Sequence, residues 1–192
     1  MPGYARPAEP RIVFLLLIAL ALACGCARQD GTPRFEIQNV DLDWSNGVLN
    51  VELQQNLALS NEARDALDNG VPLTLQLELI LRDTASQTHI EEHRADYEIR
   101  YLPLSKLFQL TLPGGDEIRT FPRLRHLLAD LSDLRFTLRT GVLPEGHFEL
   151  MARTRIDRQK IPLSMRLPTL FDAEWIHDSA WSSWPLEISP TA

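Results

Sequence analysis

The chain has 192 residues, of which 44% are apolar and 23% are charged, a composition typical of one globular domain. This composition excludes a fibrous protein and an intrinsically disordered one. The net charge of -7 argues against binding to nucleic acid by bulk electrostatics, because such binding requires a basic surface.

The N-terminus has the pattern of an export signal. Arg6 and Arg11 precede an unbroken apolar run over residues 12–23, and small residues follow. A helix of that length rises only about 18 Å, short of the roughly 30 Å hydrocarbon core of a bilayer. We therefore expect residues 1–23 to be a cleaved signal peptide and the protein to reach the periplasm or the periplasmic face of a bacterial membrane.

Three cleavage modes differ in the fate of the two cysteines. Lipidation of Cys24, in a lipobox-like Leu22-Ala23-Cys24, would anchor the domain by its acyl chains, with Cys26 as the less favoured site. Ordinary signal peptidase acting after Ala23 would release a soluble protein with both thiols, and cleavage after Ala27 would remove both. Since no other cysteine follows, we expect neither a structural disulfide nor a cysteine-based metal site.

After this leader the chain is dominated by alternating apolar and polar residues, the pattern of half-buried β-strands. Residues 35–44 form the first expected strand, with a change of phase near Asn39 that predicts a bulge. Ser45-Asn46-Gly47 is a turn signal, and residues 48–57 continue as the second strand of an antiparallel hairpin.

Two short helices are expected between further strands. The first covers Asn61–Asp68, with Ser60 as its N-cap and Gly70 as its stop, and the second covers Phe121–Leu131. The remaining strands are expected at residues 71–83, 89–102, 107–112, 134–140 and 147–158. The last two of these are expected to pair as a hairpin around the loop GVLPEG.

The strand at residues 71–83 has the clearest alternation in the chain. Five leucines share one of its faces: Leu73, Leu75, Leu77, Leu79 and Leu81. Thr74, Gln76, Glu78 and Arg82 share the other face.

Seven or eight strands joined mostly by turns predict a mainly β protein, an antiparallel β-sandwich with two short helices, with a barrel as the alternative. The sandwich domain is expected over residues 35–166, after a polar linker at residues 24–34. Residues 167–192 are rich in proline and tryptophan and are expected to form a tail packed on the domain.

Three segments carry a resemblance to a known family: YEIRYLPLSKLFQLTL, HFELMARTRIDRQKIPLSMRL and the closing W-x5-W-x2-W motif. Together they resemble the proteobacterial domain-of-unknown-function family 4390 over about residues 33–186, most closely in the Tyr-x3-Tyr-x2-Leu of Tyr97, Tyr101 and Leu104. The resemblance implies a small exported envelope protein with no assigned activity and no catalytic residues. Its members are often encoded near a nitrogen-regulation-type sensor kinase, which implies an envelope signalling partner.

The string His89-Ile90-Glu91-Glu92-His93 matches H-x-x-E-H, in which two imidazoles one helical turn apart hold zinc and a glutamate activates water. The surrounding alternation favours a strand or the loop before it. On a strand the two histidines, His89 and His93, would lie about 13 Å apart, too far for one ion. A solvated polar loop is therefore the preferred interpretation, a zinc hydrolase is the remote alternative, and no cofactor is expected.

Four arginines form a candidate binding surface: Arg135, Arg139, Arg153 and Arg155. They occupy the phases opposite the apolar residues of the last two predicted strands, so they are expected to point outward together. Such a basic stripe would suit lipid phosphates or an acidic partner, because a guanidinium group binds oxyanions in a bidentate manner. The preferred alternative is an ordinary solvated face on which these arginines pair with Glu149, Asp157 and Asp133.

Trp175, Trp181 and Trp184 offer a similar choice. Their spacing places them on no single regular face, so we expect each indole to fill a groove and to fasten the tail to the domain. The alternative is an exposed aromatic anchor for a partner or for the membrane interface.

These patterns predict a non-enzymatic binding module near a membrane, which contacts an envelope protein partner. The resemblance names a sensor kinase as one such partner. The alternative is a lipid- or glycan-binding carrier that holds an apolar ligand between its leucine-rich inner faces.

Overall fold

The computed structural model describes residues 35–162 and 173–189. The chain divides into two compact units, residues 1–32 and 33–192, and every described residue belongs to the second. The expected signal peptide, the lipidation candidate Cys24 and the linker at 24–34 lie outside the described residues. Within the described ranges, no helix has the length and the apolar character to cross a membrane.

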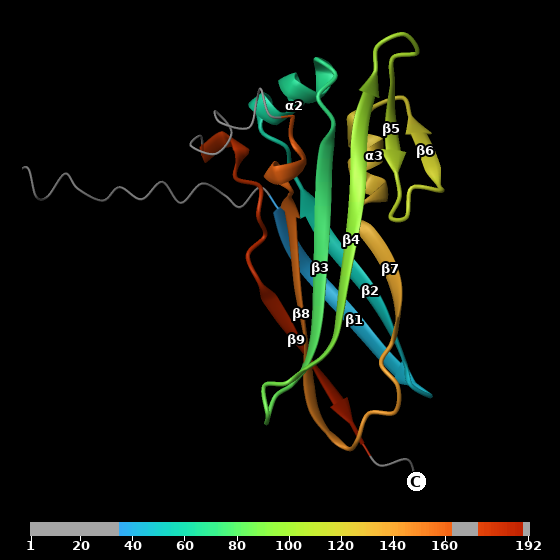
Figure 1. The fold of residues 1–192 in the computed structure, drawn as a ribbon, viewed down its shortest axis with the longest axis vertical. Coiled ribbons are helices and arrows are strands. Elements are labelled where there is room, and N and C mark those ends of the chain that lie inside the picture. The colour runs from blue at the N-terminus through green and yellow to red at the C-terminus, as the bar shows by residue number, and fades with distance from the viewer. Residues whose placement is uncertain (1–34, 163–172, 190–192) are drawn as a thin grey trace, which may run out of the picture. The chain divides into compact units, whose positions relative to one another are not determined.

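The described residues are mainly β (Figure 1). The strands are β1 (Phe35–Ser45), β2 (Val48–Leu57), β3 (Leu73–Asp83), β4 (His89–Leu102), β5 (Leu107–Thr111), β6 (Ile118–Phe121), β7 (Asp133–Arg139), β8 (Gly146–Ile156) and β9 (Ser182–Ile188). The helices are α2 (Asn61–Asp68) and α3 (Leu124–Asp130), with the short 3-10 helices η1 (Arg158–Lys160) and η2 (Ala173–Trp175).

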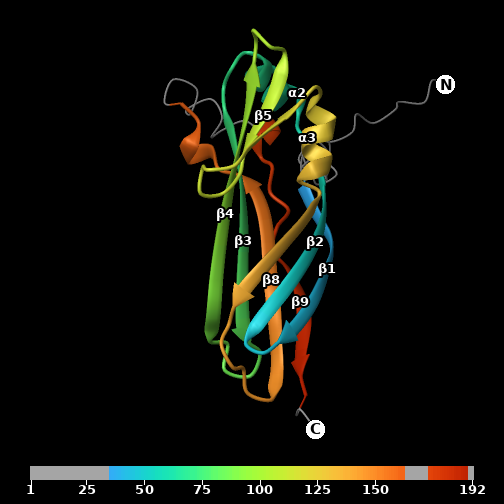
Figure 2. The ribbon, with the colours of Figure 1, turned by 90° about the vertical axis from the view of Figure 1, so that its right-hand side faces the viewer.

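These strands form two antiparallel sheets. One has three strands in the order β1-β2-β7, and the other has six in the order β6-β5-β4-β3-β8-β9. Figure 2 shows β1, β2 and β7 lying obliquely across the longer strands of the second sheet. The apolar faces of both sheets contribute to one buried core, as the predicted antiparallel β-sandwich requires.

The β1–β2 hairpin follows the sequence prediction. The register shifts between Ile37 and Asn39, where the change of phase predicted a bulge. Asn46 and Gly47 both have positive φ angles, 52° and 81°, which is the backbone of a type I′ turn. An Asn-Gly pair adopts this turn at low cost, so the two strands are joined by local chemistry alone.

Helix α2 spans the predicted residues, and Ser60 caps it by accepting a hydrogen bond from the Ala63 amide at 3.0 Å. Helix α3 begins three residues later than predicted, at Leu124. Phe121 instead ends β6, which pairs with β5 so that Phe121 lies opposite Phe108. Whether such a short segment forms a strand or a helix therefore depends on the element that it pairs with or packs against.

The predicted hairpin between the strands now labelled β7 and β8 is wrong. Strand β7 pairs with β2 in the three-stranded sheet, whereas β8 pairs with β3 and β9 in the six-stranded sheet. The connection between them therefore crosses from one sheet to the other. Alternation indicates that a segment is a strand, but it does not specify which strand pairs with it.

Part of the expected C-terminal tail belongs to the sandwich. Residues 182–188 form β9, the edge strand beside β8, and their side chains Leu186 and Ile188 are buried in the core. These residues are therefore part of a sheet rather than a tail laid on the domain.

One buried polar contact joins the two sheets. The Thr154 hydroxyl on β8 donates to Gln55 Oε1 on β2 at 2.6 Å, and Gln55 Nε2 donates to the Leu131 carbonyl at 2.8 Å. Both side chains are buried. Because a buried polar group without a partner is costly, this contact favours one alignment of the two sheets.

Candidate functional site

The polar face of β3 is covered rather than exposed. Thr74, Gln76 and Glu78 point away from the core, yet each is at most 6% exposed. Strand β3 lies inside the six-stranded sheet between β4 and β8, and long side chains from these neighbours fold over it. The covered region is the most organised polar site among the described residues.

Glu78 lies at the centre of this site and is contacted by three arginines from two neighbouring strands. Arg153 on β8 donates from Nε at 3.0 Å and also from Nη2. Arg94 on β4 donates from Nη2 at 3.0 Å, and Arg155 Nη2 lies 3.4 Å from the same carboxylate. We call these four residues the Glu78 cluster.

The electrostatics of the cluster keep Glu78 ionised. Burial by itself would raise the pKa of Glu78, but the hydrogen bond from Arg153 and the charges of Arg153, Arg155 and Arg94 lower it below its usual value of 4.5. The carboxylate is therefore a fixed negative centre that orders the three guanidinium groups around it.

A second layer of hydrogen bonds continues from the cluster toward η1. Gln76 accepts from Arg155 Nη2 at 2.8 Å and donates to Asp96 at 2.8 Å, and Lys160 Nζ contacts Asp96 at 2.8 Å. Burial would raise the pKa of Asp96, but the bonds from Lys160 and Gln76 lower it. The outer face of this sheet is thus a connected network rather than a set of independent surface pairs.

Trp181 covers one side of the Glu78 cluster. Its ring centroid lies 4.6 Å from the guanidinium carbon of Arg153, a cation–π contact. Backbone contacts hold the neighbouring segment to β8. The Ser179 amide donates to the Thr154 carbonyl at 2.9 Å, and the backbones of Asp178 and Arg155 form an isolated antiparallel β-bridge. Trp181 nevertheless remains 36% exposed, so the indole is both fixed and accessible.

The predicted stripe of four arginines does not exist as one surface. Arg153 and Arg155 lie on the outer face of the six-stranded sheet, whereas Arg135 and Arg139 lie on the outer face of the three-stranded sheet. The two pairs point in opposite directions because the apolar faces of the sheets face each other. The error follows directly from the wrong β7–β8 hairpin.

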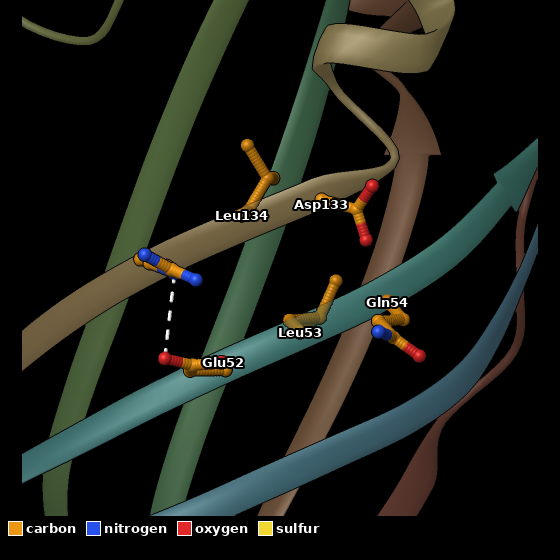
Figure 3. A pocket seen from close by; sticks show the side chains of 6 residues that line it. Glu52, Leu53, Gln54, Asp133 and Leu134 are labelled. Carbon is orange, nitrogen blue, oxygen red and sulfur yellow. Dashed lines mark ion pairs between the residues drawn. The ribbon is translucent and has the colours of Figure 1, made fainter.

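Three of these four arginines, Arg135, Arg153 and Arg155, pair with carboxylates, but with other partners than those predicted. Arg135 Nε lies 3.3 Å from Glu52 Oε1, the contact drawn as a dashed line in Figure 3, beside a hollow of about 300 Å³ between β2 and β7. Glu149, predicted to pair with this stripe, instead contacts Arg82 at 2.6 Å.

The sequence analysis places Glu78 on the polar face of a strand but does not predict it as a site residue. The available signal was its position in the longest alternating strand, since such a strand is a good candidate for the middle of a sheet, where neighbours on both sides cover it.

The three tryptophans have different environments. Trp175 is buried, as the groove-filling interpretation requires, and Trp184 on β9 lies half-buried opposite Leu150 on β8. Only Trp181 combines a defined contact with substantial exposure.

The His89–His93 string opens strand β4, so its histidines are not one helical turn apart and the zinc-protease geometry is absent. The preferred interpretation, a solvated loop, is also wrong, because the string belongs to a strand and the His93 ring packs 5.5 Å from the Phe136 ring, although His89 is exposed. Across the described ranges, no group of three or more histidine, cysteine, aspartate or glutamate side chains is placed to hold a metal ion.

Fold and site together define an antiparallel β-sandwich that carries a covered charge network on the outer face of its larger sheet. The chain belongs to the family named domain of unknown function DUF4390, whose model matches residues 32–185. The match extends from just before β1 into β9 and so includes both sheets. No curated protein and no solved structure gives a significant match to the chain.

Proposed function

We propose that this protein is a non-enzymatic binding module of the bacterial cell envelope, and that it binds a protein partner on the outer face of its six-stranded sheet. The signal-like residues 1–23 support export, and Cys24 in its lipobox-like setting supports attachment to a membrane. The family resemblance makes a membrane sensor kinase the first partner to test.

The exposed indole of Trp181, fixed on the partly covered Arg153, carries this proposal. Tryptophan and arginine are the residues most often found to dominate the binding energy of protein interfaces. Here the guanidinium group is held by Glu78 on one side and covered by the indole on another. Because both side chains are already ordered, a partner would not have to restrict them on binding.

The surroundings indicate the chemistry of the partner. Arg155 and Arg94 contact the same carboxylate as Arg153, and their side chains are 37% and 52% exposed. Their guanidinium groups therefore retain N–H donors that can face a partner. Asp178 and Glu92 lie 4.0 and 3.8 Å from the cluster's arginines and limit its positive charge. We therefore expect a partner surface with an apolar contact for Trp181 and hydrogen-bond acceptors for the arginines.

The test is crosslinking of the full chain at its native level in cells that naturally produce it, followed by identification and purification of the crosslinked protein. We expect Trp181→Ala to weaken the affinity for that purified protein by about tenfold or more. The matched control is Val142→Ala, which shortens a 90% exposed apolar side chain in the β7–β8 connection and should leave the affinity unchanged.

Both variants should unfold at the same temperature as the native protein, which shows that the effect belongs to the surface. An unchanged affinity for Trp181→Ala would overturn the proposed site. Absence of any crosslinked protein other than the chain itself would overturn the proposed function.

A further inference from the structure

Strand β7 leaves one edge of the three-stranded sheet open. It pairs with β2 alone, as the last strand in the order β1-β2-β7. A cavity of about 340 Å³ lies beside its first half and separates Asp133, Leu134 and Arg135 from Tyr97 of β4 and Arg119 of β6. Within the described part of the chain, no strand other than β2 is hydrogen-bonded to β7, so its second edge has no strand partner.

The hydrogen bonds between β7 and β2 show which backbone groups of β7 point to its other edge. The Gln55 amide donates to the Ser132 carbonyl and the Thr140 amide donates to the Gly47 carbonyl, which places the hydrogen-bonded pairs with β2 at even positions of β7. In an antiparallel ladder the intervening residues direct both backbone groups the other way. The residues that face the open edge are therefore Asp133, Arg135, Thr137 and Arg139.

The charges along this edge are arranged symmetrically. Asp133 begins the strand, Arg139 ends it, and Phe136 is the central residue of the seven. Asp133 and Arg139 are both exposed, and neither forms an ion pair with another described residue. Arg135, by contrast, already pairs with Glu52.

We propose that two copies of this chain associate edge to edge through β7, antiparallel about a two-fold axis at Phe136. In this register Asp133 of each copy lies opposite Arg139 of the other, and Arg135 lies opposite Thr137. All seven residues of the strand take part, and both unpaired charges gain an opposite charge. The contact is self-complementary, as a two-fold interface must be.

Neighbouring registers are less favourable. An axis at Arg135 would place that guanidinium group against its own copy, and an axis at Thr137 would place Arg135 opposite Arg139. Like charges directly opposite each other destabilise a strand pair. An axis nearer either end would leave fewer residues paired, so the register about Phe136 is the one that the charges select.

This association would also cover apolar surface and backbone groups that are otherwise open. Leu134 and Phe136 are half-buried in one copy, and the two Phe136 side chains would be cross-strand neighbours in a closely spaced pair. The two three-stranded sheets would become one six-stranded sheet, which removes an open edge from each copy. The surface is separate from the Trp181 site, which lies on the other sheet.

The test is the dissociation constant of the full processed protein, purified from its envelope and measured by analytical ultracentrifugation. We expect a dimer whose dissociation constant rises by about tenfold or more for Asp133→Arg and for Arg139→Asp, because each variant places two like-charged pairs in the interface. The double variant restores opposite charges and should return the constant to near its native value. Arg64→Asp is the matched control, because it makes the same charge change at an exposed arginine of α2 outside the interface, and it should leave the constant almost unchanged.

A second measurement tests the register through disulfide trapping. Phe136→Cys should give a covalent dimer on mild oxidation, because the two-fold axis brings this position against its copy. Leu134→Cys, which faces Leu138 of the copy, should not give one. A monomeric native protein, single variants without effect, a double variant without rescue, or failure of Phe136→Cys to crosslink would each overturn the proposal.

Discussion

Glu78 illustrates how a buried carboxylate is maintained on a sheet face that would ordinarily be solvated. Its desolvation is offset because three guanidinium groups contact it from the flanking strands. The intact cluster contributes modestly to stability, whereas removal of the carboxylate alone takes away the shared ion-pair partner of three partly covered cations, which is costly. Residues of this kind can specify a surface even where they add little net stability.

The lowered pKa of Glu78 predicts a stability change in acid. A carboxylate whose pKa is lower in the folded state than in the unfolded state stabilises the fold above its unfolded pKa, here about 4.5, and this contribution disappears as the pH falls through the folded pKa. We expect Glu78→Gln to lower the free energy of unfolding at neutral pH by about 2–3 kcal/mol. Denaturant unfolding at a series of pH values measures both effects.

Comparing the native protein with Glu78→Gln separates the contribution of Glu78 to acid sensitivity from that of the other carboxylates. Asp96 and Asp83 also have lowered pKa values and therefore lose stabilisation in acid in both proteins. The difference in unfolding free energy between native protein and Glu78→Gln should shrink below about pH 4.5. A difference that stays constant down to low pH would show that the charge of Glu78 is not what stabilises the cluster.

At the scale of single elements, the best predictions concern turns and helix ends. The Asn46-Gly47 turn, the bulge near Asn39 and the Ser60 cap all form as predicted, because each depends on contacts within a few residues. The start of α3 was misplaced because β6 forms through pairing with β5. An element whose identity depends on a distant partner is not determined by its own pattern.

The β1–β2 turn predicts that adding a methyl group at Gly47 lowers the stability of the fold. Gly47 has a φ of 81°, and a Cβ atom there would lie 3.1 Å from the Gly141 backbone. We expect Gly47→Ala to lower the free energy of unfolding by about 2 kcal/mol or more, from left-handed backbone strain and this steric contact together. Urea unfolding measures the loss.

Gly70→Ala is the matched control for this substitution. Its φ is 85°, but a Cβ atom at Gly70 meets nothing within 4 Å, so it carries the backbone strain alone, about 1 kcal/mol. Equal losses for the two variants would show that the approach to Gly141 does not matter.

At the scale of the whole molecule, the two sheets depend on chain segments that are far apart in sequence. Strand β9 completes the six-stranded sheet, and Leu186 and Ile188 on it belong to the core. The buried contact between Gln55 and Thr154 joins residues 99 positions apart. Stability at this scale is therefore expected to be cooperative across both sheets.

Removal of β9 tests this dependence. A chain that ends after Ala180 loses two buried apolar side chains and leaves an edge of β8 unpaired. We expect it to lose cooperative thermal unfolding and to become sensitive to protease, as measured by circular dichroism and limited proteolysis. A chain that ends after Ser189 keeps β9 and should behave as the native protein does. Cooperative unfolding of the shorter chain would show that β9 is dispensable, as a tail would be.

The amino-acid sequence by itself determined most of the strand segments, helix α2, the apolar faces that these elements bury and the local signals that join β1 to β2. These features depend on alternation, capping and turn chemistry, which act over a few residues. Only the tertiary structure decided that β7 and β8 lie in different sheets, that Arg135 and Arg153 point apart, and that Glu78 is covered. The physical reason is that strands pair through backbone hydrogen bonds, which every strand offers alike, so the choice of partner depends on packing across the whole molecule.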